Sequence, residues 1–499
     1  MNVSPDGSGD ITSNDFAGGT TPAAYPADYT CSTTYTMTAV PDTAAGYTFD
    51  FWTVQTNTAT TIYTVNPLTV SIGSVNKTVT AHFIKAADTV SLYYPHVTTR
   101  SPWQTEIALI NTSAGQTIQG RLKGFTDAGQ LIEIMDLTLA PRGRKQLTIA
   151  TAFAYHATIG YIVFQTDAAG VQGYTKFYQT GTYRTAIPAV DEINTGTIYV
   201  PHIASNSSYW TGFSLVNTNA TAKTLTLNFN DGRQASQTIN AGEHKIFTIA
   251  GLFGGQSQPA IKSAEISNAG GIIGLALFGT PTALDGFLLT DDTVSTIYYP
   301  HVADPATWWT GIVAYNPSNI AGEITITPYT ADGVALTTSA LPIDGKAKYF
   351  GEVSNLDLPA GTAWFKLTST RPLNGFELFG TWDSQRMAAY AEGSGSGARQ
   401  GVFVKLEKSG WTGIAFVNTE AEAAAVTLTA YNDSGNVVAQ NNFNVDGHAK
   451  MVKIAEQFFT PQSIANATYI GFVSDKTVVG FQLNNSADNK MLDGLPALY

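Results

Sequence analysis

The stretch Pro201-His-Ile-Ala-Ser-Asn-Ser-Ser-Tyr-Trp-Thr-Gly-Phe-Ser-Leu-Val-Asn217 decides how this chain folds, because the chain repeats its pattern. In each full copy a histidine precedes a threonine by nine residues, and that threonine precedes an asparagine by six. The copies place these residues at His96, Thr105 and Asn111, at His202, Thr211 and Asn217, and at His301, Thr310 and Asn316. A fourth copy keeps Thr412 and Asn418 but has Val402-Phe403-Val404 where the others have Pro-His. So strict a spacing indicates four copies of one folded unit.

The residues between the threonine and the asparagine alternate as in a β-strand, whose side chains point to opposite faces in turn. Thr211, Phe213, Leu215 and Asn217 share one face, and the large apolar side chains identify it as the core face. On the opposite face a tryptophan directly precedes the threonine and a glycine directly follows it. This pairing occurs at Trp210 and Gly212, at Trp309 and Gly311, and at Trp411 and Gly413.

A tryptophan beside a glycine leaves room for its ring to lie over the backbone. There the ring can cover its own sheet, pack against the next repeat or meet a ligand, since tryptophans on β-surfaces serve sugar-binding proteins as stacking platforms. Packing is the expected role, because an aromatic ring is first of all a large apolar area to bury. Trp210, Trp309 and Trp411 are the candidate ligand or interface residues.

The repeated histidines and asparagines mark the two ends of this segment. Zinc needs three or four converging ligands, and each full copy of the stretch supplies one histidine without a paired His, Cys or carboxylate at a ligand spacing. We therefore expect no metal and no other cofactor. The expected role of His96, His202 and His301 is a ring-nitrogen bond to a backbone carbonyl. Turn capping is the expected role of Asn111, Asn217, Asn316 and Asn418.

Composition narrows the class of protein. The 499 residues exceed what one core can organise, so three to five domains are expected. Charged residues make up 13%, against roughly 25% in an average soluble protein, and the net charge is −12 without any Lys/Arg cluster. Nucleic acid is therefore not an expected partner. No apolar run approaches the length of a membrane span, and the first residues carry no export signal, so an exported form is expected to have lost its signal before this numbering begins.

Turn signals divide the chain into modules. Asp-Gly or Asp-x-Gly follows each repeated stretch, as in β-hairpins, because glycine accepts a positive φ at little cost. The sequence predicts an all-β chain: a tandem array of one small β-rich module at 1–86 and four Ig-like or jelly-roll-type β-sandwiches. These repeats 1 to 4 are expected at 91–188, 197–290, 296–391 and 400–499, with a flexible linker at Gly393–Gly397.

The first module resembles the internalin B-type repeat of bacterial surface proteins, in divergent form. The resemblance rests on a Gly-x-Gly-x-Ile opening that ends at Ile11, on Tyr35-Thr-Met-Thr-Ala-Val-Pro41, on Gly46-Tyr-Thr-Phe-Asp-Phe-Trp52 and on Val79-Thr-Ala-His-Phe83. It departs from the pattern in a long insert, 15–29, and in a single cysteine, Cys31. The resemblance implies a spacer module without catalytic residues.

The four repeats resemble an uncharacterised β-sandwich repeat of exported bacterial proteins. Repeat 3 is the nearest copy, with Trp308-Trp-Thr310, Asn316-Pro317 and Ser369-Thr-Arg-Pro-Leu-Asn-Gly-Phe376. This resemblance implies a secreted or cell-surface location in bacteria and no known chemistry.

Three functions remain open at this stage. The first is a non-catalytic extracellular structural or adhesive protein, either a cell-surface rod or a fibre subunit, whose partners are other copies of itself or surface proteins. The second is a carbohydrate-binding module array with glycans as partners. The third, a polysaccharide-active enzyme, rests only on size, because the sequence contains no metalloprotease, P-loop, dinucleotide or nucleophile-elbow motif. No catalytic residue is assigned, and the chain is expected not to be an enzyme.

Overall fold

The computed structural model describes residues 1–499 except 6, 14, 16–31, 86–89, 384–385 and 391–396. The described part is almost entirely β-structure, with α-helices of a single turn at α1 (Ile149–Ala152), α2 (Ile249–Leu252) and α3 (Ala455–Phe458). This confirms the all-β prediction. Cys31, nearly all of the insert and most of the Gly393–Gly397 linker lie outside the described residues.

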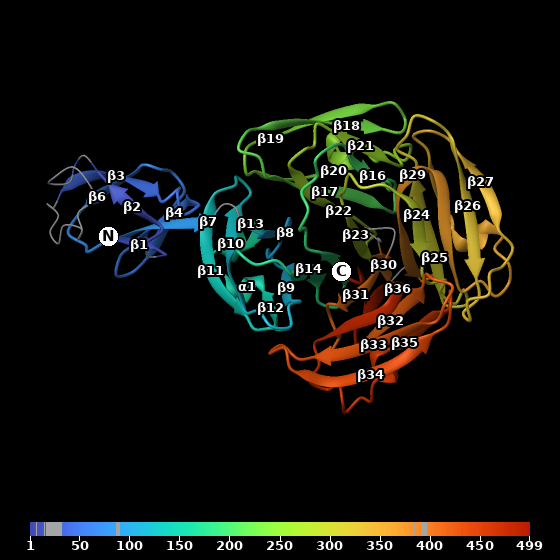
Figure 1. Cartoon of the computed structure of the whole chain (residues 1–499). Coiled ribbons are helices and arrows are strands. Elements are labelled where there is room, and N and C mark those ends of the chain that lie inside the picture. Colours follow the sequence, from blue (N-terminus) through green and yellow to red (C-terminus); the bar gives the residue numbers. More distant parts are fainter. Residues whose placement is uncertain (6, 14, 16–31, 86–89, 384–385, 391–396) are drawn as a thin grey trace.

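The N-terminal module holds two small sheets of strand order β1-β7-β4-β5 and β2-β3-β6 (Figure 1). Its strands are β1 (Asn2–Ser4), β2 (Gly9–Thr12), β3 (Thr33–Pro41), β4 (Tyr47–Gln55), β5 (Thr60–Tyr63), β6 (Leu68–Ile72) and β7 (Thr78–Lys85). Trp52 and Phe83 are buried between the sheets. The module contacts repeat 1 through the ammonium of Lys123, which lies 2.6 Å from Oδ1 of Asp50.

Each repeat is a β-sandwich of two sheets, here called the A sheet and the B sheet. In repeat 1 the A sheet has the order β11-β10-β13-β8 and the B sheet β12-β9-β14-β15. The strands are β8 (Val90–Tyr94), β9 (Gln104–Asn111), β10 (Ile118–Thr126), β11 (Leu131–Leu139), β12 (Arg144–Thr148), β13 (Ile159–Thr166), β14 (Val171–Gln179) and β15 (Tyr183–Pro188).

Repeat 2 has the A sheet β16-β21-β18-β19 and the B sheet β20-β17-β22-β23. The strands are β16 (Ile198–Val200), β17 (Trp210–Asn217), β18 (Lys223–Phe229), β19 (Gln234–Ile239), β20 (His244–Thr248), β21 (Ala264–Ser267), β22 (Ile272–Gly279) and β23 (Leu284–Leu288). The recurring stretch of sequence therefore ends in β9 of repeat 1 and in β17 of repeat 2, and each of these strands lies second in the order across its B sheet.

In repeats 3 and 4 one long strand, β29 or β36, runs through both sheets. Repeat 3 contains β24 (Val294–Tyr299), β25 (Trp308–Tyr315), β26 (Gly322–Tyr329), β27 (Ser339–Ile343), β28 (Lys348–Glu352), β29 (Trp364–Thr381) and β30 (Met387–Tyr390). Repeat 4 contains β31 (Ala398–Phe403), β32 (Trp411–Asn418), β33 (Ala424–Tyr431), β34 (Val437–Val445), β35 (Lys450–Ile454), β36 (Tyr469–Asn485) and β37 (Leu492–Pro496). Tandem β-sandwiches, as predicted, build the rest of the chain.

The repeated strand is buried on both of its faces. Phe213 and Leu215 of β17 enter the core of their own sandwich. On the other face, Val216 packs against Tyr161 and Val163, which lie on β13 in the A sheet of repeat 1. The B sheet of repeat 2 therefore covers the A sheet of repeat 1.

A contact between the B sheet of one repeat and the A sheet of the preceding repeat recurs at every junction. Each junction is called a joint and is named by its two repeats. At joint 2/3, Tyr315 of β25 donates a hydrogen bond to Glu265 of β21. At joint 3/4, Val417 of β32 packs against Trp364. At joint 4/1, Ile110 of β9 packs against Val402 of β31, so the last repeat covers the first.

The four sandwiches therefore close into a ring, and the cell-surface rod predicted from the sequence is wrong (Figure 1). The inner strands β15, β23, β30 and β37 contact one another around the axis. Head-to-tail contacts produce a ring when the rotation between neighbours closes on itself, and here it closes after four repeats.

Joint 4/1 carries a buried ion-pair network between the first and last repeats. Arg184 of β15 pairs with Asp493 of β37 and lies 2.6 Å from Glu407, while Lys405 lies 3.0 Å from Asp493. Burial alone would raise the pKa of Asp493, but Arg184 and Lys405 hold that pKa well below its usual value. The carboxylate is therefore charged at neutral pH and joins the two ends of the ring.

The strand-end asparagines cap turns, as predicted. Asn316 is fully buried; its Nδ2 donates to the carbonyl oxygens of Ile320 and Asp344, and its Oδ1 accepts from the Ser318 amide at 3.0 Å. The side chain thus joins two turns at one end of the sandwich.

We predict that Asn316→Ala lowers the free energy of unfolding by about 3 kcal/mol, because it leaves several buried backbone groups without partners. Chemical denaturation measures the change. Asn319→Ala, an exposed asparagine of the same turn, is the matched control and should shift stability by less than about 0.5 kcal/mol. Equal effects of the two substitutions would contradict the capping role.

Asp493→Asn should cost about 3–5 kcal/mol at pH 7, because it leaves the buried Arg184 and Lys405 charges without their counter-ion. A carboxyl with a depressed pKa stabilises the fold above its unfolded pKa and loses that effect as the pH falls towards the folded pKa. The difference from the natural protein should therefore shrink below about pH 4. Glu422→Gln, in an exposed ion pair, is the control, and an unaltered Asp493→Asn protein at pH 7 would exclude ring closure through this network.

Candidate functional site

A deep groove lies at joint 2/3 and is the candidate binding site. It has a volume of about 950 Å³ and is lined by five aromatic residues, Tyr209, Phe278, Trp309, Phe350 and Trp382. Tyr209 and Phe278 come from repeat 2 and the other three from repeat 3, so the groove exists only where the two repeats meet. We call it the aromatic groove.

Trp309 lies flat over the backbone of its own sheet, as its glycine neighbour suggested. A Cβ atom at Gly380 would fall 2.1 Å from Cζ2 of the ring, and one at Gly311 would fall 3.3 Å from Cζ3. Gly380 is therefore required for this position of the ring, and a side chain at Gly311 would make a tight contact with it. The half-buried ring packs against the core of repeat 2 and also lines the groove.

Phe350 and Trp382 are the most exposed aromatic residues of the groove, at 53% and 52%. The centroid of the Phe350 ring lies 4.8 Å from that of His202, and the Trp382 indole donates a hydrogen bond of 3.0 Å to the Pro305 carbonyl. These two rings give the groove apolar walls that are open to solvent.

The sequence identified Trp309 but missed the other aromatic residues of the groove. Phe350 stands where repeat 2 has Ile246, and Trp382 where repeat 2 has Pro281. The sequence feature that could have identified these residues is an aromatic residue at a solvent-facing position where the other repeats have a different residue. A comparison restricted to the residues that all repeats share does not detect such differences.

The other two tryptophan candidates lie at different joints. Trp210 is 39% exposed, and Trp411 is half-buried. Each ring lies over the glycine two positions after it. A Cβ atom at Gly212 would lie 3.4 Å from Cζ3 of Trp210, and one at Gly413 would lie 3.1 Å from Cζ3 of Trp411. The structure therefore does not bring the three candidates into one site.

The repeated histidines bond to side chains of the following repeat, and the predicted bond to a backbone carbonyl is wrong. Nδ1 of His301 lies 2.9 Å from Nζ of Lys450, and Nδ1 of His202 lies 3.4 Å from Nζ of Lys348. Burial lowers the pKa of both histidines far below the usual value, so the neutral rings accept from the ammonium groups. At joint 1/2 the equivalent contact joins His96 to His244, at 3.5 Å. A single repeat could not reveal these partners, which belong to the next one.

No group of three or more His, Cys, Asp or Glu side chains placed to hold a metal occurs within the described ranges. In the same part of the chain, no helix has the length and apolar character needed to cross a membrane.

A serine, a histidine and an aspartate meet at joint 1/2 in an order that resembles a hydrolase triad. His244 Nε2 lies 2.7 Å from Ser214 Oγ, and His244 Nδ1 lies 2.8 Å from Asp127 Oδ1. Ser214 is only 3% exposed, and its Oγ also lies 3.0 Å from the Pro95 carbonyl. A substrate could reach this hydroxyl only if repeats 1 and 2 separated, so the three residues act as a buried polar bridge.

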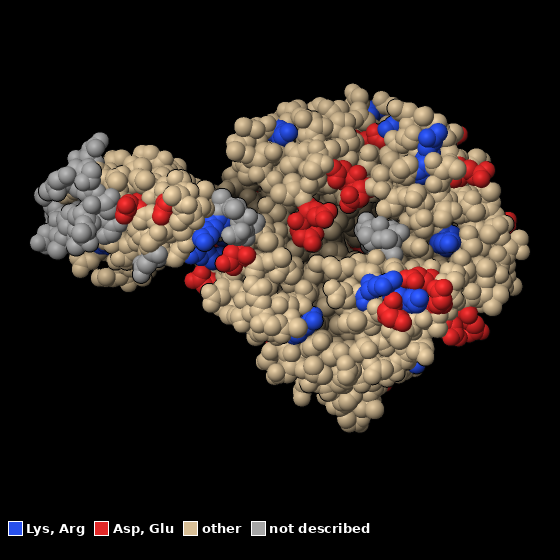
Figure 2. Space-filling view, viewed as in Figure 1, with Lys and Arg blue, Asp and Glu red and all other residues tan. Residues whose placement is uncertain are grey.

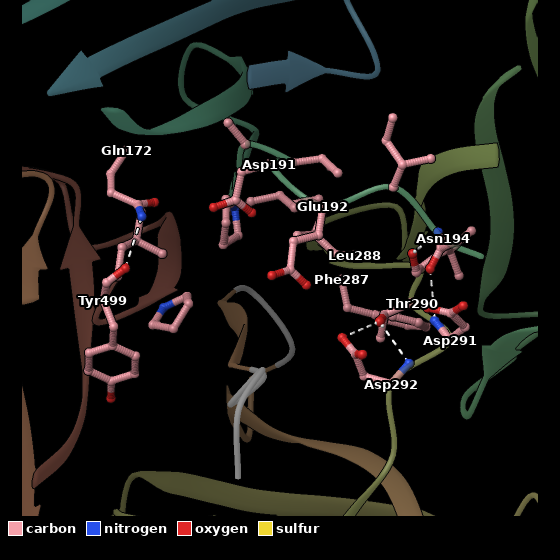
Figure 3. A pocket seen from close by; sticks show the side chains of 18 of the residues that line it. Gln172, Asp191, Glu192, Asn194, Phe287, Leu288, Thr290, Asp291, Asp292 and Tyr499 are labelled. Carbon is pink, nitrogen blue, oxygen red and sulfur yellow. Dashed lines mark hydrogen bonds between the residues drawn. The ribbon is translucent and has the colours of Figure 1, made fainter. Parts of the chain in front are cut away.

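A second cavity, of about 740 Å³, opens at the axis of the ring between β15, β23 and the C-terminal residues (Figure 3). Acidic side chains gather beside this hollow (Figure 2). Asp291 accepts hydrogen bonds from the Thr195 and Gly196 amides, while Asp191 and Glu192 are exposed. Exposed carboxylates lack the apolar surroundings that a general acid needs.

Comparison with known proteins leaves the family open. No protein family matches the sequence, and no curated protein matches it. One solved structure with some likeness is SGBP-B of the mixed-linkage glucan utilization locus of Bacteroides ovatus, in complex with a mixed-linkage heptasaccharide. It shares 12% identity and covers 74% of this chain and 88% of its own, with a TM-score of 0.11. A score this low carries no argument about fold or function.

A fluorophosphonate probe, which labels activated serines in accessible active sites, should leave the folded protein unlabelled because Ser214 is closed off between two repeats. Gel fluorescence followed by peptide mass spectrometry makes the measurement. Labelling of Ser214 that disappears in Ser214→Ala would show that the bridge is an active site.

Proposed function

We propose that this chain is a non-catalytic extracellular protein that binds carbohydrate in the aromatic groove. The observation that carries the proposal is the convergence of Tyr209, Trp309, Phe350 and Trp382 on one cavity. Sugar rings present flat C–H faces that pack on aromatic rings, and binding sites combine such apolar walls with a few polar groups that fix orientation.

The polar groups of the groove suit a hydroxyl-rich ligand. The side chains of Asn206, Asn230, Asn355 and Glu352 line it. Asn206 accepts from the amides of Ser208 and Tyr209, which fixes the loop that carries the Tyr209 ring. Amide and carboxylate groups offer both donors and acceptors to sugar hydroxyls.

The groove favours binding over hydrolysis. Glycosidases as a rule use two carboxyl groups that flank the scissile bond. Among the described residues that line the groove, Glu352 is the one carboxylate. A protein that binds a glycan without cleaving it also fits the adhesive role predicted from the sequence, while a cell-surface location and assembly into a fibre stay predictions.

Trp382→Ala should weaken binding of a matching oligosaccharide by about tenfold or more, because an aromatic anchor at the centre of a site carries much of the binding energy. A glycan array identifies the oligosaccharide, and isothermal titration calorimetry measures the affinity. Folding should be unaffected, since the ring is half exposed.

Trp210→Ala is the matched control, because Trp210 is likewise an exposed tryptophan, at 39%, but lies at joint 1/2. Its affinity should equal that of the natural protein. Loss of binding in Trp210→Ala with full binding in Trp382→Ala would move the site away from the groove, and an array without any bound glycan would remove the proposed function.

A further inference from the structure

A basic residue stands at the same position in each repeat and contacts the preceding repeat. It is the first residue of β12, β20, β28 and β35, namely Arg144, His244, Lys348 and Lys450. Because each reaches a buried joint, its polar end needs a partner there.

At two joints the structure supplies a carboxylate from the preceding repeat. Arg144 lies 3.1 Å from Asp433, and His244 lies 2.8 Å from Asp127. The two joints of repeat 1 are therefore compensated from within the chain. At joint 3/4, Lys450 lies beside His301 and donates to the Ala363 carbonyl, while burial raises the pKa of Glu377 well above its usual value.

Joint 2/3 differs, because its turn aspartate is engaged elsewhere. Asp231 pairs with Arg233 of its own turn, at 2.6 Å. In the described part of the chain no carboxylate lies within 4.0 Å of the Lys348 or Lys262 ammonium. Lys348 has instead the Lys262 carbonyl as acceptor and the neutral ring of His202 beside it.

Both lysines line the aromatic groove. Nζ of Lys348 lies 5.1 Å from the centroid of the exposed Phe350 ring. The third lysine of the groove, Lys346, is neutralised by Glu265 at 2.7 Å. Joint 2/3 thus combines two lysines that have no paired carboxylate with a groove that opens to solvent.

We infer that the ligand of the aromatic groove is an acidic saccharide, whose carboxylate or sulfate group lies against Lys348 and Lys262 while its sugar rings pack on the aromatic walls. The inference rests on the proposed function and names the class of its ligand. An anion placed there supplies the carboxylate partner that the two joints of repeat 1 obtain from the chain itself, and charge-assisted hydrogen bonds from ammonium groups suit either anion.

The affinity should depend on pH. Burial and the nearby Lys262 lower the pKa of Lys348 to about 7, so this amine loses its proton as the pH rises from 6 to 8.5. The other ionisable groups that face it are His202, Lys262, the Lys346–Glu265 pair and Glu352. His202 stays neutral throughout, because burial holds its pKa far below the usual value. An acidic ligand should therefore bind about tenfold more tightly at pH 6 than at pH 8.5.

The test compares three ligands by calorimetry with the full-length protein: a uronic-acid oligosaccharide, a sulfated oligosaccharide and a neutral glucan oligosaccharide of equal length. At least one acidic ligand should bind more tightly than the neutral one. Comparison of the uronic-acid ligand with the sulfated ligand then identifies whether carboxylate or sulfate is preferred. Lys262→Gln and Lys348→Met should each weaken acidic binding by about tenfold and leave neutral binding within about twofold. Because Lys262 is exposed, its substitution should not disturb folding, and Lys145→Gln on repeat 1 is the matched control.

The outcomes separate the two claims. Equal affinity for neutral and acidic ligands, unchanged by either lysine substitution, would overturn the inference and leave the proposed function standing. Binding of no saccharide at all would overturn both. An acidic preference that survives both lysine substitutions would place the anion elsewhere and also contradict the inference.

Discussion

The structure depends on how the second face of each B sheet is covered. A strand such as β17 is apolar or small on both faces, so its sandwich leaves one sheet exposed until another surface buries it. The A sheet of the preceding repeat provides that surface at every joint. Because each contact joins the back of one repeat to the front of the next, the last contact joins repeat 4 to repeat 1, where Arg184 and Asp493 compensate each other's charge.

The sequence predicted what lies within one repeat and failed where two repeats meet. Phe213 and Leu215 alternate with the period of a strand, and Asn316 needs only its own turns, so both could be predicted from local pattern. The bond between His301 and Lys450 joins residues 149 positions apart in different repeats, and no local pattern contains it. The rod was predicted because a repeated sequence specifies copies of a unit but not the angle between neighbours.

The candidate site is formed by residues that differ from those at the same positions in the other repeats. Phe350 and Trp382 are individual to repeat 3, and Asp231 pairs with Arg233 of its own turn and not with the next repeat. The shared residues build the ring, and the departures at one joint leave a groove with aromatic walls and two lysines without an internal counter-ion. Trp309 and His202 belong to both sets, since each contributes to the joint and also lines the groove.

Closure of the ring is the central claim, because the groove exists only if repeats 2 and 3 are held in this arrangement. Small-angle X-ray scattering of the full-length protein tests it most directly. The ring predicts a compact distance distribution with one main maximum and a short tail from the N-terminal module, and a radius of gyration somewhat above the about 23 Å of a single compact chain of 499 residues. A long, skewed distribution typical of a rod would contradict the account.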